Sequence, residues 1–461
     1  MRDLREQPIS SVFANRGFLN LWLNQILVQL SYNSLNFALI IWVFQLTHSN
    51  FAVSALLLAI NLPALLFGLF VGVLVDISDR KRIMMVVNIL LSGCFFSLIF
   101  FKEYYAIILM VAFIINILSQ VYAAAESSAI PLIVKRHQLL SANSLFSTTL
   151  FSCFLLGFGL AGPLINFFDI NLLFGIGGGL LTFAFIMTFI FPSIVSQAHQ
   201  RGEMLIKAFA KRSYSDITQI GLEEVIETLR IIKSKLIIFS SFFILASVQV
   251  VVAIMAVLIP DFFEKVLHIK STDASYVLIM PLGIGMVVGG FLMSRFGHLQ
   301  PRRKIIGRAI ILAGILFFIT GIAPLIAPVI KHIKFPQTLP FYYQPPLSAI
   351  LATGSFLLGL TMVSTIVPAQ TTLQENTPEH SRGKIFAVLG AAMAGLSILP
   401  VLVTGFLADI FGTMPIFIGL GGIIILFGLF ILKPTFYFGE KNLPHSLKEL
   451  LGLRQLNSKR K

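Results

Sequence analysis

The sequence predicts an all-α polytopic membrane protein with twelve transmembrane helices in two pseudo-symmetric halves of six. Of its 461 residues, 57% are hydrophobic and only 12% are charged, and the mean hydropathy is +0.90. Apolar runs long enough to span a bilayer follow one another along the chain. The alternating ten-residue pattern of an outer-membrane barrel is absent. Together these observations favour a helical membrane protein.

Twelve spans are predicted from these apolar runs. They are residues 18–46, 51–75, 83–101, 105–129, 140–168 and 172–193 in the first half, and residues 236–260, 275–296, 305–330, 347–370, 385–411 and 414–432 in the second. Because the number is even, both termini are expected on the same side of the membrane.

The net charge of +14 comes from Lys and Arg residues whose distribution indicates the orientation of the protein in the membrane rather than nucleic-acid binding. Of the 34 Lys and Arg residues, all fall on one side except Lys102, Lys265, Lys270, Lys331 and Lys334. Cytoplasmic loops are enriched in Lys and Arg, so this basic side is predicted to be cytoplasmic, together with both tails. We therefore predict a multi-pass protein of the cell (inner) membrane that contacts anionic lipid headgroups and binds no nucleic acid.

Five parts follow from this pattern. They are a cytoplasmic N-terminal segment (1–17), a first six-helix half (18–193), a cytoplasmic linker (194–235), a second six-helix half (236–432) and a basic cytoplasmic tail (433–461). In the linker, apolar residues of the stretch 216–235 recur at helical spacing while its glutamates face away, which predicts an amphipathic helix along the membrane interface. A regulatory helix that binds a partner is the alternative.

A charged turn after the second span has a weaker copy in the second half. Gly72 and Asp76 of the first copy correspond to Gly290 and Ser294 of the second. Two similar halves in the same orientation form a parallel repeat, in which the substrate site is expected between the halves near the middle of the membrane.

These features resemble the major facilitator superfamily, whose signature loop reads roughly Gly-x-x-x-Asp-Arg-x-Gly-Arg-Lys. The residues that keep this pattern are Gly72, Asp76, Arg80 and Lys81 in the first copy and Gly290, Arg295 and Gly297 in the second. Ile77 stands where the family has an arginine, and Asp79 where it has a glycine. The resemblance implies the major facilitator fold. It also implies that these loops act as a conformational latch, in which the aspartate contacts the opposite half when the cavity faces outward.

Finer marks resemble the bacterial branch of drug and metabolite exporters that includes macrolide and enterobactin efflux proteins. They are residues 15–22 before the first span, 130–134 and 141–143 between the fourth and fifth, and 373–375, 378 and 382–384 after the tenth. More loosely, Gly157, Gly159, Gly162 and Pro163 resemble a motif of the superfamily's antiporters. This resemblance implies drug or metabolite efflux coupled to proton antiport.

Polar side chains in the first span form the predicted substrate-contacting surface. Gln25, Gln29, Tyr32 and Asn36 lie on one helix face, with Asn33 beside them. Polar groups in lipid are costly unless they face the bundle interior, which favours a lining role. Alternatively, these amides bond to neighbouring helices and hold the bundle together. Further predicted substrate-binding residues are Asn116, Gln120, Gln249, Thr361 and Thr365.

Glu126 is the candidate for proton coupling. It is the carboxylate that the span assignment places inside a helix and away from its ends, about one turn from the cytoplasmic side. A buried carboxyl group that titrates near neutrality could carry a proton across the membrane. The alternative is a salt bridge to Arg80, Arg82 or another loop cation.

No pattern for catalysis, metal binding or nucleotide binding occurs in the sequence. We therefore predict no enzyme and no cofactor, but a secondary transporter that exports a small lipophilic or amphipathic compound by alternating access. Its expected partners are the substrate, the proton gradient and membrane lipids, and a monomer is sufficient. A lysophospholipid or siderophore carrier on the same fold is the alternative. A lipid-modifying membrane enzyme and a channel are the alternatives from other classes.

Overall fold

The computed structural model describes residues 15–135, 138–191, 236–330, 345–377 and 382–432. The predicted amphipathic helix in the linker lies outside the described residues, as do most of the N-terminal segment and the tail.

Helices make up all the regular structure of this described part, and twelve of them are long and apolar enough to cross a membrane. They are α2 (Arg16–Thr47), α3 (Asn50–Ile77), α4 (Arg80–Phe101), α5 (Tyr105–Ile133), α6 (Leu139–Phe168), α7 (Ile170–Thr188), α10 (Leu236–Asp261), α11 (Met280–Phe296), α12 (Arg302–Ile330), α13 (Pro345–Asn376), α14 (Arg382–Phe411) and α15 (Thr413–Leu432). A π-helical turn, η4 (Ser275–Ile279), precedes α11. Each predicted span coincides with one helix, so the all-helical prediction is confirmed.

The outward surfaces of these helices are apolar. Phe100 is 78% exposed, Phe167 80% and Val287 69%. In water, exposed side chains of this kind would form large apolar patches that promote aggregation, whereas in a bilayer they contact the hydrocarbon of the lipids.

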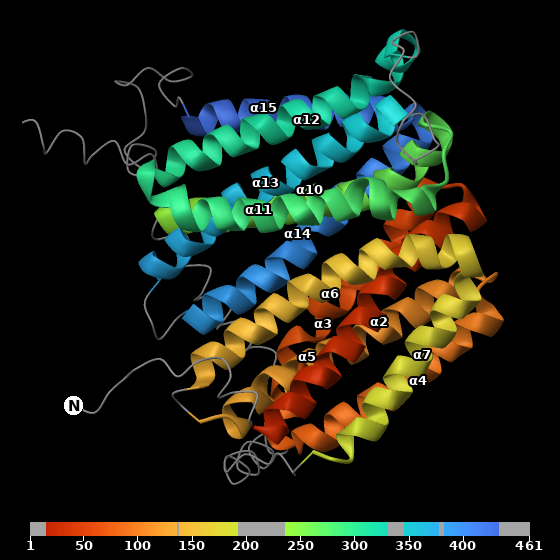
Figure 1. The fold of residues 1–461 in the computed structure, drawn as a ribbon, viewed down its shortest axis with the longest axis vertical. Coiled ribbons are helices and arrows are strands. Elements are labelled where there is room, and N and C mark those ends of the chain that lie inside the picture. Colours follow the sequence, from red (N-terminus) through yellow and green to blue (C-terminus); the bar gives the residue numbers. More distant parts are fainter. Residues whose placement is uncertain (1–14, 136–137, 192–235, 331–344, 378–381, 433–461) are drawn as a thin grey trace, which may run out of the picture. The chain divides into compact units, whose positions relative to one another are not determined.

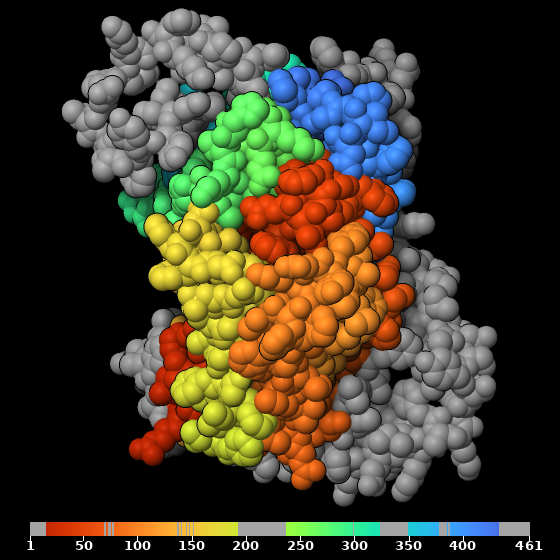
Figure 2. All heavy atoms as spheres, turned by 90° about the vertical axis from the view of Figure 1, so that its right-hand side faces the viewer, coloured from red at the N-terminus to blue at the C-terminus, as the bar shows by residue number. Residues whose placement is uncertain are grey.

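The chain forms two compact units. The first comprises Met1–His48 and Ala55–Leu222, and the second comprises Ser49–Ser54 and Glu223–Lys461. In the first, α2 packs along α6 and α7, while α4 packs along α5 and α7. Figures 1 and 2 both show the orange α4 beside the yellow α7. In the second, α12 packs along α15, α11 along α13, and α10 along α14.

The last two helices of each unit meet at a one-residue corner with a positive φ. Asp169 (φ 96°) joins α6 to α7, and Gly412 (φ 80°) joins α14 to α15. The Asp169 carboxylate also caps α7, accepting from the backbone N–H of Ile170 at 2.7 Å, and it lies 3.8 Å from the Lys102 ammonium. Equivalent corners at equivalent places are what a parallel repeat produces.

A seam of glycines holds α12 against α15, the helices drawn side by side in Figure 1. The glycines of this glycine seam are Gly307, Gly314 and Gly321 on α12 and Gly421 and Gly428 on α15. A Cβ atom on Gly314 would lie only 2.8 Å from the backbone nitrogen of Ile425 and 2.9 Å from the carbonyl oxygen of Gly421. The two main chains therefore approach as closely as the absence of side chains allows.

We predict that Gly314→Ala lowers the stability of the protein by about 1–3 kcal/mol, because the added methyl group must push the two helices apart. Thermal unfolding of the purified protein in detergent measures this. Gly422→Ala is the matched control, since a Cβ atom there meets nothing within 4 Å. Equal melting temperatures of the two variants would contradict the close contact.

Candidate functional site

A buried polar network joins four helices of the first unit. Its members are Asn24 on α2, Asn88 on α4, and Tyr122 and Glu126 on α5, each at most 5% exposed. Asn24 Nδ2 donates to the carbonyl oxygen of Ala184 on α7 at 2.8 Å, and Asn88 Nδ2 donates to Asn24 Oδ1 at 3.2 Å. The network therefore fixes the orientation of the Asn24 amide, whose Oδ1 acts as an acceptor.

The Tyr122 hydroxyl group connects this network to Glu126. Its oxygen lies 2.8 Å from Asn24 Oδ1 and 3.1 Å from Glu126 Oε1. A phenol carries one proton and can donate it to only one of these two oxygens. Because Asn24 Oδ1 can only accept, both bonds form together when the carboxyl group of Glu126 carries a proton and donates it to the phenol oxygen. Both hydrogen bonds of the Tyr122 hydroxyl are therefore satisfied when Glu126 is the neutral acid.

The predicted alternative for Glu126, a salt bridge, is not among the ion pairs that the structure describes. The cations named for it have other contacts: Arg82 Nε lies 3.9 Å from Asp79 Oδ2, and Arg80 donates to the carbonyl oxygen of Ser78 at 3.1 Å. Glu126 is thus a buried carboxyl group whose described side-chain partner is a neutral phenol.

The polar residues that were predicted to form a substrate-contacting surface on α2 differ in their hydrogen-bond partners. Gln25 Nε2 donates to the carbonyl oxygen of Phe146 on α6 at 3.3 Å, and the Tyr32 hydroxyl donates to Asn116 Oδ1 on α5 at 2.6 Å. Asn33 Nδ2 donates to its own helix, at the carbonyl of Gln29. Gln25, Tyr32 and Asn116 therefore connect helices within the first unit, as the alternative interpretation of these residues expects. Gln29 and Gln120 are partly exposed, while Asn36 is 8% exposed.

Gly157, one of the residues on α6 that resemble the antiporter motif, has a packing role. A Cβ atom on Gly157 would lie 2.7 Å from Asn33 Cβ and 3.0 Å from the backbone nitrogen of Ser34. Gly157 therefore lets α6 lie directly on α2.

The charged turn between α3 and α4 is bound into the first unit. Asp79 caps α4 through the backbone N–H of Lys81 at 3.0 Å. The Lys81 ammonium donates to the carbonyl oxygens of Phe189 and Phe191 at 3.0 and 2.6 Å, at the end of α7 where a cation is favoured. Arg80 is buried. The side chain of Asp76 lies outside the described side chains, as does the surrounding of Gly72.

In the second copy of the loop, Gly290 meets nothing within 4 Å of a built Cβ atom. The Arg295 guanidinium lies over the ring of Phe296, 5.8 Å from its centroid. Ser294 donates to a carbonyl of its own helix. No contact of these residues with another helix is described.

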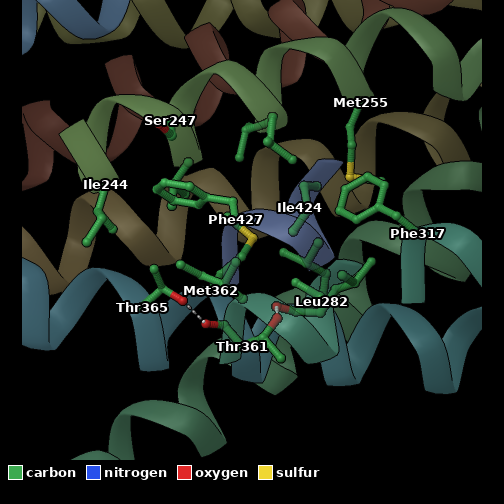
Figure 3. A pocket seen from close by; sticks show the side chains of 16 residues that line it. Ile244, Ser247, Met255, Leu282, Phe317, Thr361, Met362, Thr365, Ile424 and Phe427 are labelled. Atoms are coloured by element: carbon green, nitrogen blue, oxygen red, sulfur yellow. Dashed lines mark hydrogen bonds between the residues drawn. The ribbon is translucent and has the colours of Figure 1, made fainter. Parts of the chain in front are cut away.

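An apolar cavity opens among five helices of the second unit. It holds about 680 Å³ of space, part of it open, and its residues come from α10, α11, α12, α13 and α15. Figure 3 shows Met255, Phe317, Met362 and Phe427 around this space, with Thr361 and Thr365 on one wall. Of the predicted residues, the cavity brings together Thr361 and Thr365. Gln249 does not line it.

The hydroxyl groups of the cavity wall are already engaged. Thr361 donates to the carbonyl oxygen of Leu358 at 2.8 Å, Thr365 to that of Thr361 at 2.9 Å, and Ser247 to that of Phe243 at 2.8 Å. Their protons serve the helix backbone, so only oxygen lone pairs remain for a ligand. The cavity therefore suits an apolar group, with weak acceptors at one wall. The flexible thioether side chains of Met255 and Met362 adapt to ligands of irregular shape.

Sequence reasoning missed two features of these sites. Asn24 and Asn88 are single polar residues in apolar runs and were not singled out, although such residues in lipid signal a buried partner. The aromatic and methionine lining of the cavity has no local signal in a chain with 44 Phe residues. Among the described residues, no group of three or more His, Cys, Asp or Glu side chains could hold a metal ion.

We predict that Tyr122→Phe lowers the stability of the protein by about 1–2 kcal/mol, because it leaves a buried amide oxygen and a buried carboxyl group without their shared partner. Thermal unfolding in detergent measures the change. Tyr104→Phe, at a position 62% exposed next to the same helix, is the control. If the two variants melt alike, the network does not contribute to stability.

Comparison with known proteins identifies a family and several relatives that this chain resembles. The model of the Major Facilitator Superfamily matches residues 21–335. Macrolide efflux protein A of Streptococcus pyogenes is 22% identical over 314 residues, which cover 67% of this chain and 73% of that protein. Macrolide efflux protein A of Enterococcus faecalis is 22% identical over 282 residues, covering 59% and 82%.

Solved structures share the fold at low sequence identity. A POT family transporter in complex with 5-aminolevulinic acid has a TM-score of 0.66 at 12% identity, covering 95% of this chain and 100% of its own. The nucleoside transporter NupG has a TM-score of 0.61 at 14% identity, covering 90% and 98%. With its twelve membrane-length helices and a family match over more than half of its length, the chain is a multi-pass membrane transporter that belongs to the major facilitator superfamily.

Proposed function

We propose that this transporter is a secondary active exporter of small lipophilic or amphipathic compounds, driven by proton antiport and working by alternating access. The observation that carries the proposal is the apolar cavity of the second unit, with its aromatic and methionine walls. The similarity to two macrolide efflux proteins supports export of drug-like molecules.

The proposed substrate contacts combine apolar and polar groups. The cavity would take the apolar part of the substrate, beside Thr361 and Thr365. The amide groups of the first span and its neighbours would meet polar parts during transport. This set consists of Gln25, Gln29, Tyr32, Asn33, Asn36, Asn116, Gln120 and Gln249. Within this set, Gln25 has an acceptor that a substrate could use, because its buried Oε1 accepts no hydrogen bond from the described residues.

Proton coupling is assigned to Glu126. The protonated acid satisfies both bonds of the Tyr122 hydroxyl, whereas loss of the proton would turn the phenol proton to the carboxylate and break the bond between Tyr122 and Asn24. Deprotonation therefore strains the network that joins α2, α4, α5 and α7. Such a link between proton occupancy and helix packing is what an antiporter requires.

The remaining parts of the proposal follow the sequence. The protein is expected in the cell (inner) membrane as a monomer with both termini in the cytoplasm. The conformational latch would comprise Gly72, Asp76, Arg80, Lys81, Gly290 and Arg295. The docking of Lys81 on the end of α7 supports this role for the first copy, because it couples the turn to a whole helix of its unit.

Accumulation of a fluorescent lipophilic cation or a macrolide tests the function. In efflux-deficient cells that express this chain, we expect lower accumulation, and a protonophore should reverse the effect. An unchanged accumulation across a chemically varied panel would contradict drug export. Labelled lysophospholipid and siderophore, measured in the same cells, would then test the alternative carrier on the same fold.

Replacement of Glu126 by Gln should uncouple export from pH. The amide keeps the size of the side chain and can donate to the Tyr122 oxygen as the neutral acid does, but it releases no proton. Initial export rates measured between pH 6 and 8 should vary in the parent protein and stay flat in the variant. Glu103→Gln, at an exposed position between α4 and α5, is the control. Persistence of the parent's pH profile in Glu126→Gln would return Glu126 to a structural role.

Filling the cavity should reduce export. Met362→Trp adds volume to the side chain that Figure 3 shows facing the cavity, and we expect at least about a tenfold lower rate for bulky substrates. Val367→Trp on the same helix, at a position 42% exposed, controls for the presence of a new Trp. If both variants export equally well, the cavity does not hold the substrate.

A further inference from the structure

A second hollow of the second unit has a different character from the apolar cavity. It is a groove between α11, α12 and α13 that holds about 690 Å³, much of it open to the outside. Met293, Phe296, Leu312 and Leu360 form its apolar lining, and Gln300 and Arg308 contribute polar groups. Phe296 is 47% exposed and Leu312 37%, so the groove lies on the surface of the helix bundle.

Arg308 is the unusual member of this lining. It lies six residues after the start of α12, which places its Cα atom about 9 Å along the helix from Arg302. A cation at that depth is costly unless it reaches back toward the interface. Its side chain does so, because Nη1 donates to Gln300 Oε1 at 2.9 Å, before the helix begins.

The charge of Arg308 meets no carboxylate among the ion pairs that the structure describes. Arg302, on the same helix, contrasts with it: both of its terminal nitrogens bond the carboxylate of Glu375, at 2.5 and 2.8 Å. A guanidinium has five N–H donors, and Arg308 directs one of them to Gln300. A second cation lies close by, since Arg295 packs against the ring of Phe296 in the groove wall.

We propose that this groove binds one anionic phospholipid of the surrounding leaflet. The phosphate accepts hydrogen bonds from the Arg308 guanidinium, which suits phosphate geometry, and from the Gln300 amide. One acyl chain lies along Met293, Phe296 and Leu312. A lipid fits better than a soluble anion because the same groove joins a cation at its end to an exposed apolar wall.

The groove shares Thr361 with the wall of the apolar cavity, but Arg308, Gln300 and Leu312 line only the groove. Lipid binding can be measured directly, so its test needs no transport. The full chain is purified in detergent, and lipid retention is measured by native mass spectrometry after adding phosphatidylglycerol or phosphatidylcholine. We expect preferential retention of one phosphatidylglycerol molecule. Glycerol phosphate, which has the anion and no acyl chain, should bind at least about tenfold more weakly.

Two variants and one control locate the site. Arg308→Gln should weaken phosphatidylglycerol retention by at least about tenfold, because it removes a charge-assisted bond. Leu312→Trp should weaken it as well, by filling the acyl-chain part of the groove. Lys304→Gln removes one charge from the same helix outside the groove lining and should leave retention unchanged.

Several results would overturn the proposal. Equal retention of phosphatidylcholine would exclude recognition of the anionic headgroup, and equally tight binding of glycerol phosphate would exclude the acyl chain. Equal effects of Arg308→Gln and Lys304→Gln would show that the attraction is a general property of the basic surface.

Discussion

Close contact between helix backbones is the constraint on which the second unit depends. Lipid tails are as apolar as leucine, so burying apolar side chains between membrane helices gains little, and packing must supply the attraction. The glycine seam between α12 and α15 does this from Gly307 to Gly321, over about four helical turns. The α11–α13 pair uses the same device, because a side chain on Gly285 would collide with the backbone of Phe356, and one on Gly359 with that of Leu282. All four helices of these two pairs contribute residues to the lining of the apolar cavity.

The first unit adds side-chain hydrogen bonds to close contacts of this kind, such as that of Gly157 on α6 with α2. Side-chain hydrogen bonds cross between its helices at many depths: Trp22 donates to Thr149, Ser92 to the carbonyl of Gly178, and Asn24 to that of Ala184. Away from water such bonds have no competitor, and leaving one unmade costs more than making it gains. Comparable bonds of the second unit, such as Arg302 to Glu375 and Arg303 to the carbonyl of Ile431, lie at helix ends. The proposed proton-coupling role of Glu126 depends on this difference, because a carboxyl group can influence helix packing only where polar bonds contribute to it, and Glu126 lies in the first unit.

Hydropathy predicted the elements because length and apolar composition decide whether a segment spans a membrane. All twelve predicted spans correspond to helices, and most boundaries agree within a few residues. The contacts of individual polar residues could not be predicted in the same way. Helical periodicity assigns Gln25 and Tyr32 to one face of α2, but it does not say whether that face meets a cavity or another helix, and both side chains bond to neighbouring helices. Glu126 shows the same limit, since a carboxyl group near several loop cations suggests a salt bridge until Tyr122 is seen beside it.

The two corners with positive φ show how a repeat can keep its geometry while its chemistry diverges. Both corners turn the chain between the last two helices of a unit in a single residue. Gly412 needs no partner, because glycine adopts a positive φ without steric strain. Asp169 adopts it at a cost that its bonds to Ile170 and Asn171 offset, and its charge lies near Lys102. The same divergence separates the interiors of the two units. The two units thus share the same single-residue corner in the backbone, whereas polar contacts occupy the interior of the first and an apolar cavity that of the second.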